Sequence, residues 1–305
     1  MILLVEQVLN GVQLGVMLFL MAAGLTLIFG IMNVINLAHG SLYMIGAYVA
    51  AVTFAASGSF LLGLVAALMA AAGVGLALEI VVFRTLYGRD HLDQVIATFA
   101  IIIVVNQGVK LLWGGAPLTM PMPEALSGSV RLMEGLLYPV WRLAIIACGL
   151  AVALGLYGLV SHTRTGMRVR AGASNAEMAA ALGINIRRLF SIVFGFGSML
   201  AGFAGIMVAP IFSVEPGMGD TVLVLALVVI VIGGIGSIRG ALLGALLVGL
   251  VDALGRSFLV DLLRLAIGPS PARTIGPAIG SMLIYLVMAL VLTFRPSGLF
   301  PARGR

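Results

Sequence analysis

Long apolar stretches recur along the whole of this 305-residue chain, and they leave few folds open to it. The hydrocarbon core of a bilayer is about 30 Å thick, so a helix of about 20 apolar residues can cross it. The chain shows nine such stretches, near residues 6–31, 36–56, 60–83, 94–113, 140–161, 190–210, 220–238, 241–258 and 274–294. They lack the alternating pattern of membrane barrel strands. The sequence therefore predicts an all-α polytopic membrane protein, folded as one domain over residues 1–305.

The number of crossings is less firmly fixed than the fold class. The region 220–258 fits two spans, but it also fits one broken span or a re-entrant pair, because polar and glycine residues interrupt it. We therefore expect about 8–10 transmembrane helices. Two connections are long: residues 114–139 on one face, and residues 162–189 on the other.

Composition excludes several classes of protein. Apolar residues make up 62% of the chain and charged residues 9%, which a soluble core of this size cannot accommodate. Cys148 is the only cysteine, so neither an internal disulfide nor a cysteine-built metal site is possible. The only lysine, Lys110, lies between Val109 and Leu111, so the chain has no Walker A loop. If ATP drives this protein, another subunit hydrolyses it.

The arginines predict the orientation. Eleven of the 17 basic residues fall on one face of a nine-span arrangement and six on the other. Those on the richer face are Arg84, Arg89, Arg164, Arg168, Arg170, Arg187, Arg188, Arg239, Arg295, Arg303 and Arg305. The positive-inside bias makes this face cytoplasmic, which places the N-terminus outside and the C-terminus inside. The net charge of +6 is thus explained without a nucleic-acid partner.

Small residues recur every four positions in several predicted spans. The sets are Gly197, Ala201 and Gly205; Ala241, Ala245 and Gly249; and Gly11 with Gly15. Such stripes allow helix backbones to approach closely in lipid. They predict tight static packing, and the same spacing is compatible with a surface that slides during a conformational cycle.

A short helix is predicted inside the cytoplasmic connection, over residues 174–183. Ser174 and Glu177 have capping-box spacing, and Gly183 suits the left-handed position after the last turn. A proline at Glu177 is expected to disrupt such a helix. It is too short to span the bilayer, so it either lies at the lipid headgroups or docks as a rigid rod in a groove of a cytoplasmic protein.

The same segment carries a family resemblance. The residues that resemble the coupling segment of ABC importer permeases are Arg170, Ser174, Asn175, Glu177, Ala180, Leu182 and Gly183. Met178 departs from the general pattern, where alanine is expected, and Gly183 comes early. This form is most similar to that of the branched-chain amino-acid (LivH-type) permeases. Further segments resemble that family: residues 24–30, 36–40, 165–168, 233–237 and 295–300.

The resemblance implies a transport subunit rather than an enzyme. Members import branched-chain amino acids, other hydrophobic amino acids, or amide- and urea-type solutes, and they are multi-pass proteins of the bacterial inner membrane. Implied partners are a second homologous permease subunit, two cytoplasmic ATPase subunits and a periplasmic or extracellular solute-binding protein. The chain itself would carry no cofactor, because ATP and Mg²⁺ bind to the ATPase subunits.

Two polar or glycine-rich interruptions are candidates for the substrate route. The first holds Asn33, Asn36, His39 and Tyr43, and the second holds Gly233, Gly234 and Gly236. Free backbone groups inside a membrane are tolerated only where protein or a cavity surrounds them. Asparagine offers both a donor and an acceptor, which suits an amino-acid zwitterion. An ordinary cytoplasmic turn is the alternative for each interruption.

The alternative function is that of an ion-coupled secondary transporter. An ion-coupled secondary transporter of a small polar solute needs intramembrane carboxylates that face a cavity. Glu79 and Asp252 are the candidates, but Arg84 and Arg256 lie close to them in sequence and predict internal ion pairs. An intramembrane hydrolase is disfavoured too, since the chain has no Gly-x-Ser-x-Gly elbow.

Overall fold

The computed structural model describes residues 2–300, apart from the side chains of Ala266 and Ile267, so the tail arginines Arg303 and Arg305 lie outside the described residues. The first six helical elements are α1 (Ile2–Met32), α2 (His39–Ser57), α3 (Phe60–Leu78), a π-helical turn (Glu79–Phe83), α4 (Arg84–Leu86) and α5 (His91–Trp113). A 3₁₀ turn (Glu124–Leu126) and strands β1 (Ser129–Met133) and β2 (Leu136–Pro139) follow. The remaining helices are α6 (Val140–His162), α7 (Arg164–Ser174), α8 (Ala176–Ala181), α9 (Ile186–Val208), α10 (Met218–Gly233), α11 (Ile238–Ile267) and α12 (Pro269–Phe294).

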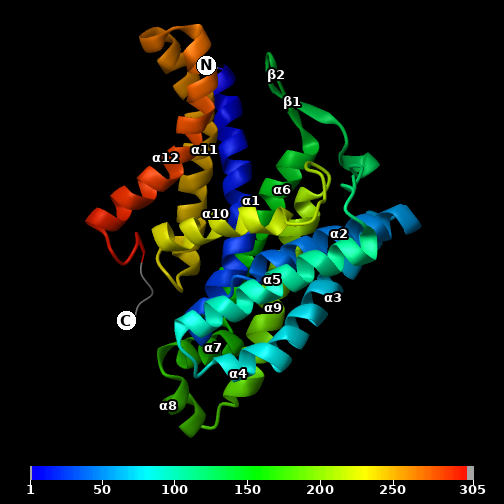
Figure 1. Ribbon diagram of the computed structural model, residues 1–305, viewed down its shortest axis with the longest axis vertical. Helices are drawn as coiled ribbons and strands as arrows, with labels where there is room; N and C mark the ends of the chain where they lie inside the picture. The colour runs from blue at the N-terminus through cyan, green and yellow to red at the C-terminus, as the bar shows by residue number, and fades with distance from the viewer. Residues whose placement is uncertain (1, 301–305) are drawn as a thin grey trace.

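Eight helices within the described residues are long and apolar enough to cross a membrane. This confirms the predicted all-α polytopic fold. The expected span at 220–238 is shorter than predicted, because α10 has 16 residues and would reach only about 24 Å along its axis. In Figure 1, α10 lies across α1 rather than along it. The nine-span count is therefore corrected to eight spans and one short apolar helix.

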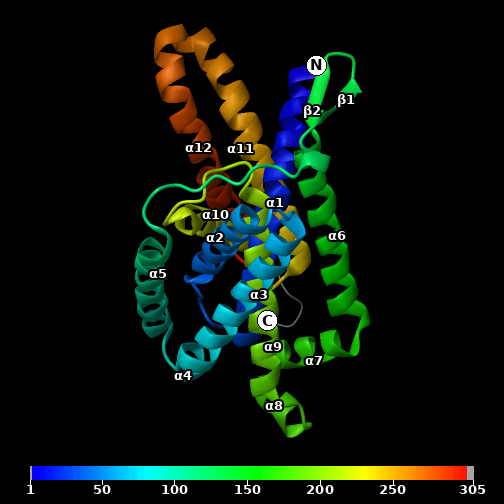
Figure 2. The same ribbon diagram turned by 90° about the vertical axis from the view of Figure 1, so that its right-hand side faces the viewer.

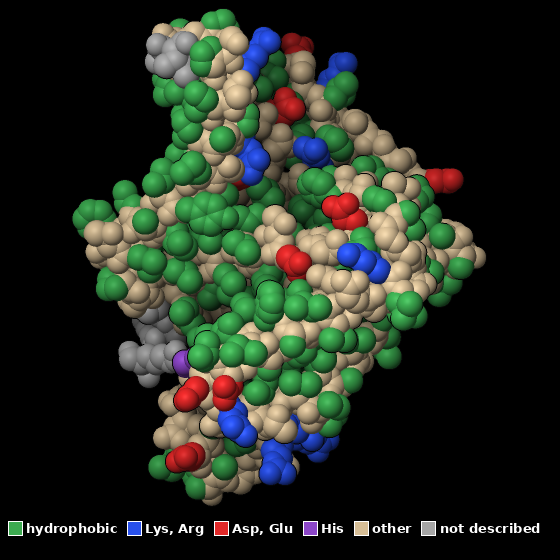
Figure 3. All heavy atoms as spheres, in the orientation of Figure 1, with side chains coloured by type: hydrophobic (Ala, Val, Ile, Leu, Met, Phe, Trp, Pro, Cys, Tyr) green, Lys and Arg blue, Asp and Glu red, His purple; other side chains and the backbone are tan. Residues whose placement is uncertain are grey.

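The arginine-rich connections lie together at one end of the molecule. In Figures 1 and 2, α4, α7 and α8 lie at the lower end, and the N-terminus lies at the upper end. On the face drawn in Figure 3, several basic side chains gather at that lower end, below a broad hydrophobic region. This arrangement is the one that the positive-inside bias predicts. We refer below to the lower end as the cytoplasmic end.

Helix α1 runs through the centre of the molecule and is buried from Gly11 onward, apart from a few partly exposed positions. The predicted small-residue stripes form its contacts. A Cβ atom added to Gly15 would lie 2.7 Å from the carbonyl oxygen of Ala245 on α11, and one on Gly197 of α9 would lie 3.0 Å from the carbonyl oxygen of Gly24. Backbones approach this closely only where no side chain separates them. The stripes therefore hold α9 and α11 against opposite stretches of α1.

The outer helices expose much of their apolar surface. Leu111 of α5 is 88% exposed and Leu154 of α6 is 73% exposed. Apolar side chains in a membrane are stable where they face lipid tails, so these helices form the periphery of the bundle. A site that binds a polar solute or a protein partner must therefore lie among the buried helices or at the ends of the molecule.

The outer connection is more ordered than the sequence indicated. Strands β1 and β2 form an antiparallel hairpin, and Gly135 has the positive φ of 85° that its turn requires. Asn10 near the start of α1 accepts hydrogen bonds from Arg142 Nη1 at 2.6 Å and from Tyr138 Oη at 3.2 Å. These bonds fasten the hairpin and α6 to the outer end of α1.

Candidate functional site

The cytoplasmic connection contains two helices where one was predicted. The additional helix, α7, begins at the cap residue Thr163, whose Oγ1 accepts a hydrogen bond from the Gly166 amide at 3.0 Å. Gly166 packs directly on the last carbonyls of α6, where a Cβ atom would overlap the backbone. Arg170 donates a hydrogen bond to the carbonyl of Val160. Helix α7 is thereby fixed at a sharp angle to the end of α6.

The short helix α8 is present, but its start was wrongly predicted. Ser174 is the last residue of α7, and Asn175 is the cap of α8. The Asn175 backbone is extended (φ −157°, ψ 103°), and its Oδ1 accepts a hydrogen bond from the Met178 amide at 2.8 Å. The reason is that the preceding helix holds Ser174 in helical geometry, so the cap moves one residue along. No Ser174–Glu177 capping box forms.

The new start also changes what Glu177 does. Glu177 lies in the first turn of α8, where backbone amides have no partner within the helix. A proline at Glu177 would remove no hydrogen bond within the helix, but it would disfavour the helical geometry of Ala176 before it, so the expected disruption stays a prediction. The Glu177 carboxylate lies near the positive end of the helix dipole, where a negative charge is favourable.

The end of α8 was correctly predicted. Gly183 has φ 87°, and its amide donates to the carbonyl of Ala180 at 2.9 Å. The Ile184 amide donates to the carbonyl of Ala179 at 3.1 Å, which completes a Schellman cap. With both ends capped, the six residues of α8 form a stiff rod about 9 Å long.

The α8 rod presents apolar side chains outward. Met178 is 59% exposed and Leu182 is 77% exposed, whereas Ala179 is buried against the protein. Behind the rod, α7 packs on the buried bundle: a Cβ atom on Gly172 would lie 3.0 Å from Leu189 of α9 and 3.9 Å from Ile31 of α1. A force on α8 would therefore reach the cytoplasmic ends of α1 and α9 through α7.

The first interruption, residues 33–38, is a non-helical segment that ends in a turn at residues 37–38; most of it is buried or partly buried, but Asn33 is exposed. Helix α1 ends at Met32, and Asn33 after it has a positive φ of 51°. The chain then turns back along α1, because a Cβ atom on Gly24 would lie 2.9 Å from Nε2 of His39, which begins α2. Gly24 is more than two helical turns from the end of α1. Helix α2 thus starts inside the bundle.

Gln94 at the start of α5 fixes this segment. Its Oε1 accepts a hydrogen bond from the Ile35 amide at 3.2 Å, and its Nε2 donates to the carbonyls of Leu86 and Arg89 at 3.3 and 3.2 Å. The Gln94 side chain is almost wholly buried. Sequence reasoning had not singled out this residue, since a lone glutamine in a predicted span gives no signal of its partners.

Asn36 and the first residues of α2 are buried, and some of their side chains have spare hydrogen-bonding capacity. Asn36 is 1% exposed, and neither its Oδ1 nor its Nδ2 has a partner among the described residues. The hydroxyl of Ser41, in the first turn of α2, is also buried without one. His39 and Tyr43 are buried in the same turns. A buried polar group without a partner is costly, so such atoms mark a place where a polar solute or water binds.

The second interruption, residues 234–237, joins α10 to α11 through glycines. Gly234 and Gly236 have positive φ values of 105° and 80°, and Gly233 packs on Gly240 so closely that a Cβ atom would overlap its carbonyl. The Ser237 hydroxyl caps α11 by accepting from the Gly240 amide at 3.1 Å.

The second interruption lies against the end of α1 that leads into the first. A Cβ atom on Gly30, near the end of α1, would lie 2.9 Å from the Cα atom of Gly236. The segment after α12 closes the second interruption: the amides of Leu299 and Phe300 donate to the carbonyls of Ile232 and Gly233 at 2.8 and 2.9 Å. Both interruptions therefore adjoin α1, the first by following its last residue and the second by packing against Gly30.

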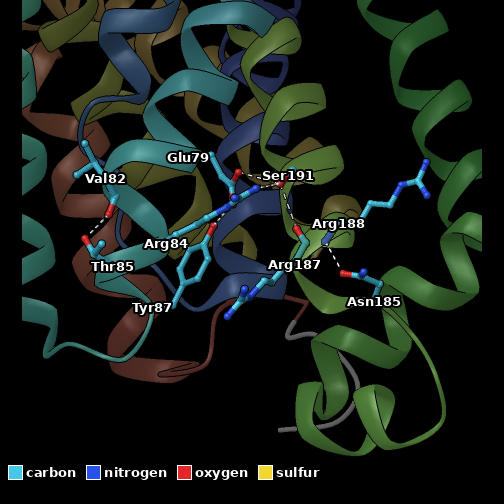
Figure 4. Close-up of polar contacts among 9 residues, drawn as sticks. All are labelled: Glu79, Val82, Arg84, Thr85, Tyr87, Asn185, Arg187, Arg188 and Ser191. Atoms are coloured by element: carbon cyan, nitrogen blue, oxygen red, sulfur yellow. Dashed lines mark hydrogen bonds and ion pairs between the residues drawn. The ribbon is translucent and has the colours of Figure 1, made fainter.

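Figure 4 shows a third polar centre, which joins α3 to α9. Glu79 is fully buried, and its carboxylate accepts hydrogen bonds from Arg84 Nε at 3.2 Å, Tyr87 Oη at 2.8 Å and Ser191 Oγ at 2.8 Å. Burial, together with the neighbouring Glu79 carboxylate, raises the pKa of the Tyr87 hydroxyl, which therefore remains a neutral donor. The predicted Glu79–Arg84 pair is confirmed. Tyr87 and Ser191 were not anticipated.

The second predicted ion pair is also present. Asp252 accepts a hydrogen bond from Arg256 Nε at 2.7 Å on α11. Both candidate carboxylates are thus bound to arginines. Each candidate carboxylate therefore has an internal cationic partner.

Comparison with known proteins gives consistent results. The family model for the branched-chain amino acid transport system / permease component matches residues 7–294. The high-affinity branched-chain amino acid transport permease BraD of Pseudomonas aeruginosa is 30% identical over 306 residues, which cover 96% of this chain and 94% of BraD. LivH of Salmonella typhimurium is 31% identical over 274 residues, with 83% of this chain and 86% of LivH covered.

A sugar permease is related as well. The ribose import permease RbsC of Escherichia coli is 28% identical over 244 residues, which cover 76% of this chain and 72% of RbsC. No solved structure matches significantly. The similarity therefore extends across permeases for chemically different solutes.

Proposed function

Because the chain belongs to the family of branched-chain amino acid transport permeases, we propose that it is the membrane subunit of an ATP-driven importer for branched-chain or other hydrophobic amino acids, or for related amide- or urea-type solutes. It is a multi-pass protein of the bacterial inner membrane. In this proposal it pairs with a second homologous permease subunit. Two cytoplasmic ATPase subunits and a solute-binding protein complete the importer, and ATP and Mg²⁺ bind only to the ATPases.

One observation carries the proposal: α8 is a rod capped at both ends that exposes Met178 and Leu182 at the cytoplasmic end. An apolar rod of this kind suits a cleft in a protein partner. Its rigid attachment through α7 to α1 and α9 would transmit closure of the ATPases to the two interruptions. The resulting alternating access needs no chemistry in this chain.

The solute route is proposed at the first interruption. Asn36, His39 and Tyr43 would face the solute there, with Asn33 at the cytoplasmic end. Gly233, Gly234 and Gly236 would form an adjoining wall. A transported solute must leave as well as enter, so a few weak polar contacts serve better than a tight site. Selection would lie mainly with the binding protein.

Ion coupling is not supported by the carboxylates. Glu79 and Asp252 each accept a hydrogen bond from an arginine, so each carboxylate already has a cationic partner within the chain. The ion-coupled alternative predicts uptake by this chain alone in vesicles that carry an ion gradient. The proposed function predicts none.

The coupling role is tested by two prolines in the same short helix. Ala180→Pro removes an internal hydrogen bond of α8 and clashes with the preceding turn, so the rod should be lost. Ala176→Pro is the matched control: it occupies the first position, and Asn175 before it already has the extended backbone that a following proline favours. Uptake should fall at least about tenfold in the first variant only, because proline costs about 3 kcal/mol inside a helix.

The two variants are compared at equal abundance in the membrane. ATP hydrolysis and solute uptake of the co-purified assembly are measured together. Loss of uptake with retained ATP hydrolysis supports coupling through α8. Normal uptake in Ala180→Pro contradicts it.

The solute class is tested on the same assembly. Leucine, isoleucine, valine, short amides, urea and ribose are each added with the binding protein, and stimulation of ATP hydrolysis is recorded. Stimulation by branched-chain amino acids or by amides supports the proposal. Stimulation by ribose alone would overturn the proposed solute class, but it would leave the ATP-driven mechanism in place.

A further inference from the structure

A groove runs between α3 and α9 at the cytoplasmic end, and it belongs to neither the proposed route nor α8. Its volume is about 610 Å³. Its lining residues combine a basic end with an apolar wall: Ala72, Leu76, Arg84, Asn185, Arg187, Arg188, Ser191, Ile192, Gly195, Phe196 and Met199. Such a combination matches a ligand that is anionic at one end and apolar along the rest.

The basic end carries more positive charge than the protein neutralises. The buried carboxylate of Glu79 pairs with Arg84, which accounts for one of the three arginines. Arg187 and Arg188 are exposed, and neither forms an ion pair within the described residues. Both arginines line the groove, and in Figure 4 they extend from opposite sides of α9, Arg187 toward Tyr87 and Arg188 away from it. The lining residues therefore carry two arginine charges that form no ion pair within the described residues.

The apolar wall rises from this basic end along both helices. Ile192 is 53% exposed, and Leu76, Phe196 and Met199 are half-buried. All four belong to stretches that are apolar and long enough to cross the membrane. The wall thus continues into the depth of the hydrocarbon region, where an apolar chain gains by contact and a water-soluble acidic peptide does not follow.

Fixed contacts define the floor of the groove. Ser191 on α9 donates to Glu79 at 2.8 Å and accepts from Arg84 Nη2 at 3.1 Å, so α9 is joined to the end of α3 there. A Cβ atom on Gly195 would lie 3.1 Å from Leu76, so α3 and α9 also pack closely at this level. The two walls of the groove are therefore held at a fixed spacing.

We propose that this groove binds one phospholipid with an anionic headgroup from the cytoplasmic leaflet. The phosphate and headgroup would contact Arg84, Arg187 and Arg188, and one acyl chain would lie along Leu76, Ile192 and Phe196. Basic pockets between membrane helices on the cytoplasmic side favour such lipids over zwitterionic ones. This inference depends only on the membrane location and not on the proposed transport function.

The test counts lipids bound to the purified full chain. The chain in detergent is titrated with phosphatidylglycerol or with phosphatidylcholine of the same acyl chains, and bound lipids are counted by native mass spectrometry. Phosphatidylglycerol should bind more tightly. The double variant Arg187→Gln/Arg188→Gln should weaken its binding about tenfold, since each arginine near an anionic lipid contributes measurably.

A charge-matched control isolates the groove. Arg164→Gln/Arg168→Gln removes the same charge from α7, which does not line the groove. This variant should bind phosphatidylglycerol like the wild type. Equal losses in both double variants would show a non-specific charge effect and overturn the proposal, as would equal binding of the two lipids by the wild type.

Two further arms separate lipid from other occupants. Ile192→Gln should weaken phosphatidylglycerol binding severalfold through the acyl chain, and free glycerol phosphate at the same concentration should not compete. Competition by glycerol phosphate would mean that the site takes a soluble anion and would overturn the lipid assignment. Loss of co-purifying subunits from Arg187→Gln/Arg188→Gln, with unchanged lipid binding, would identify a protein contact and overturn it as well.

Discussion

The two interruptions of the membrane helices both adjoin α1, yet they are built differently. The first, residues 33–38, is non-helical, and Asn36 within it and Ser41 just after it are buried side chains with no hydrogen-bond partner among the described residues. The second, residues 234–237, is a tight turn that contains two glycines of positive φ. The carbonyls of Ile232 and Gly233 just before it accept hydrogen bonds from the segment after α12. The first interruption therefore has buried polar side chains without hydrogen-bond partners, whereas the backbone carbonyls beside the second already accept hydrogen bonds.

A helix in a membrane can be interrupted for two reasons: to allow close packing of backbones, or to place polar groups in the interior. Glycines allow close approach and positive φ, which solve a packing problem between α1, α10 and α11. Buried carboxamides and hydroxyls solve no packing problem, because unpaired polar groups cost free energy. In the proposed function, a polar solute supplies the missing partner. The comparison therefore predicts that mutations at the first interruption change transport, and that mutations at the second change stability.

The largest effect is expected at the residue that anchors the first interruption. Gln94→Leu removes the hydrogen bonds to the Ile35 amide and to the carbonyls of Leu86 and Arg89, and it leaves these partly buried groups without that partner. The expected loss is about 3 kcal/mol of stability. Thermal melting of the purified chain measures it.

A neighbour in the same helix serves as the control for Gln94. Thr98→Val changes a fully buried residue one turn away, whose hydroxyl bonds only to carbonyls of α5 itself. It should cost less than about 1 kcal/mol. Equal melting temperatures for the two variants would mean that Gln94 does not hold the first interruption in place.

The next effect is expected at the second interruption. Gly233→Ala places a methyl group against the carbonyl of Gly240, and the strain should cost about 2 kcal/mol. Gly108→Ala on α5 is the matched control, because a Cβ atom there meets nothing within 4 Å. Abundance in the membrane and thermal melting should fall for Gly233→Ala only. A similar response of both variants would remove the packing explanation for the glycine turn.

Transport itself is tested at Asn36. Asn36→Leu removes a buried carboxamide that has no protein partner, so the folded chain should keep its stability or gain about 1 kcal/mol. Uptake should fall about tenfold, which corresponds to about 1.4 kcal/mol of lost interaction with the solute. Radiolabelled uptake at matched abundance measures this. The affinity of the binding protein for its solute should not change, and unchanged uptake would assign Asn36 to the structural residues.

Much of the fold was predictable because the bilayer constrains it. Apolar stretches of the right length predicted the spanning helices, and small-residue spacing predicted the contacts of Gly15 and Gly197. The length of α10 was not predictable in the same way. An apolar stretch indicates burial or lipid contact, but only its neighbours decide whether it crosses the membrane or lies across another helix.

The candidate site was predictable where chemistry is local. Gly183 ends α8 as expected, because a Schellman cap depends on adjacent residues. Ser174 and Asn175 are both good cap residues, and the choice between them depended on α7, which has no apolar stretch to reveal it. Ser191 is 112 residues away from Glu79. No spacing rule connects such a pair, so contacts of this kind required the structure.

The smallest effect, and the sharpest test of the comparison, is at the cap of α11. Ser237→Ala removes the hydroxyl that accepts from the Gly240 amide at 3.1 Å, and it should cost about 1 kcal/mol. The side chain contributes to helix α11 and not to the proposed route, so uptake per folded chain should stay the same. Uptake is therefore divided by the amount of folded chain, measured from thermal melting and membrane abundance. A fall in normalised uptake as large as that of Asn36→Leu would mean that the second interruption also contacts the solute. The assignment of transport to the first interruption and of packing to the second would then be wrong.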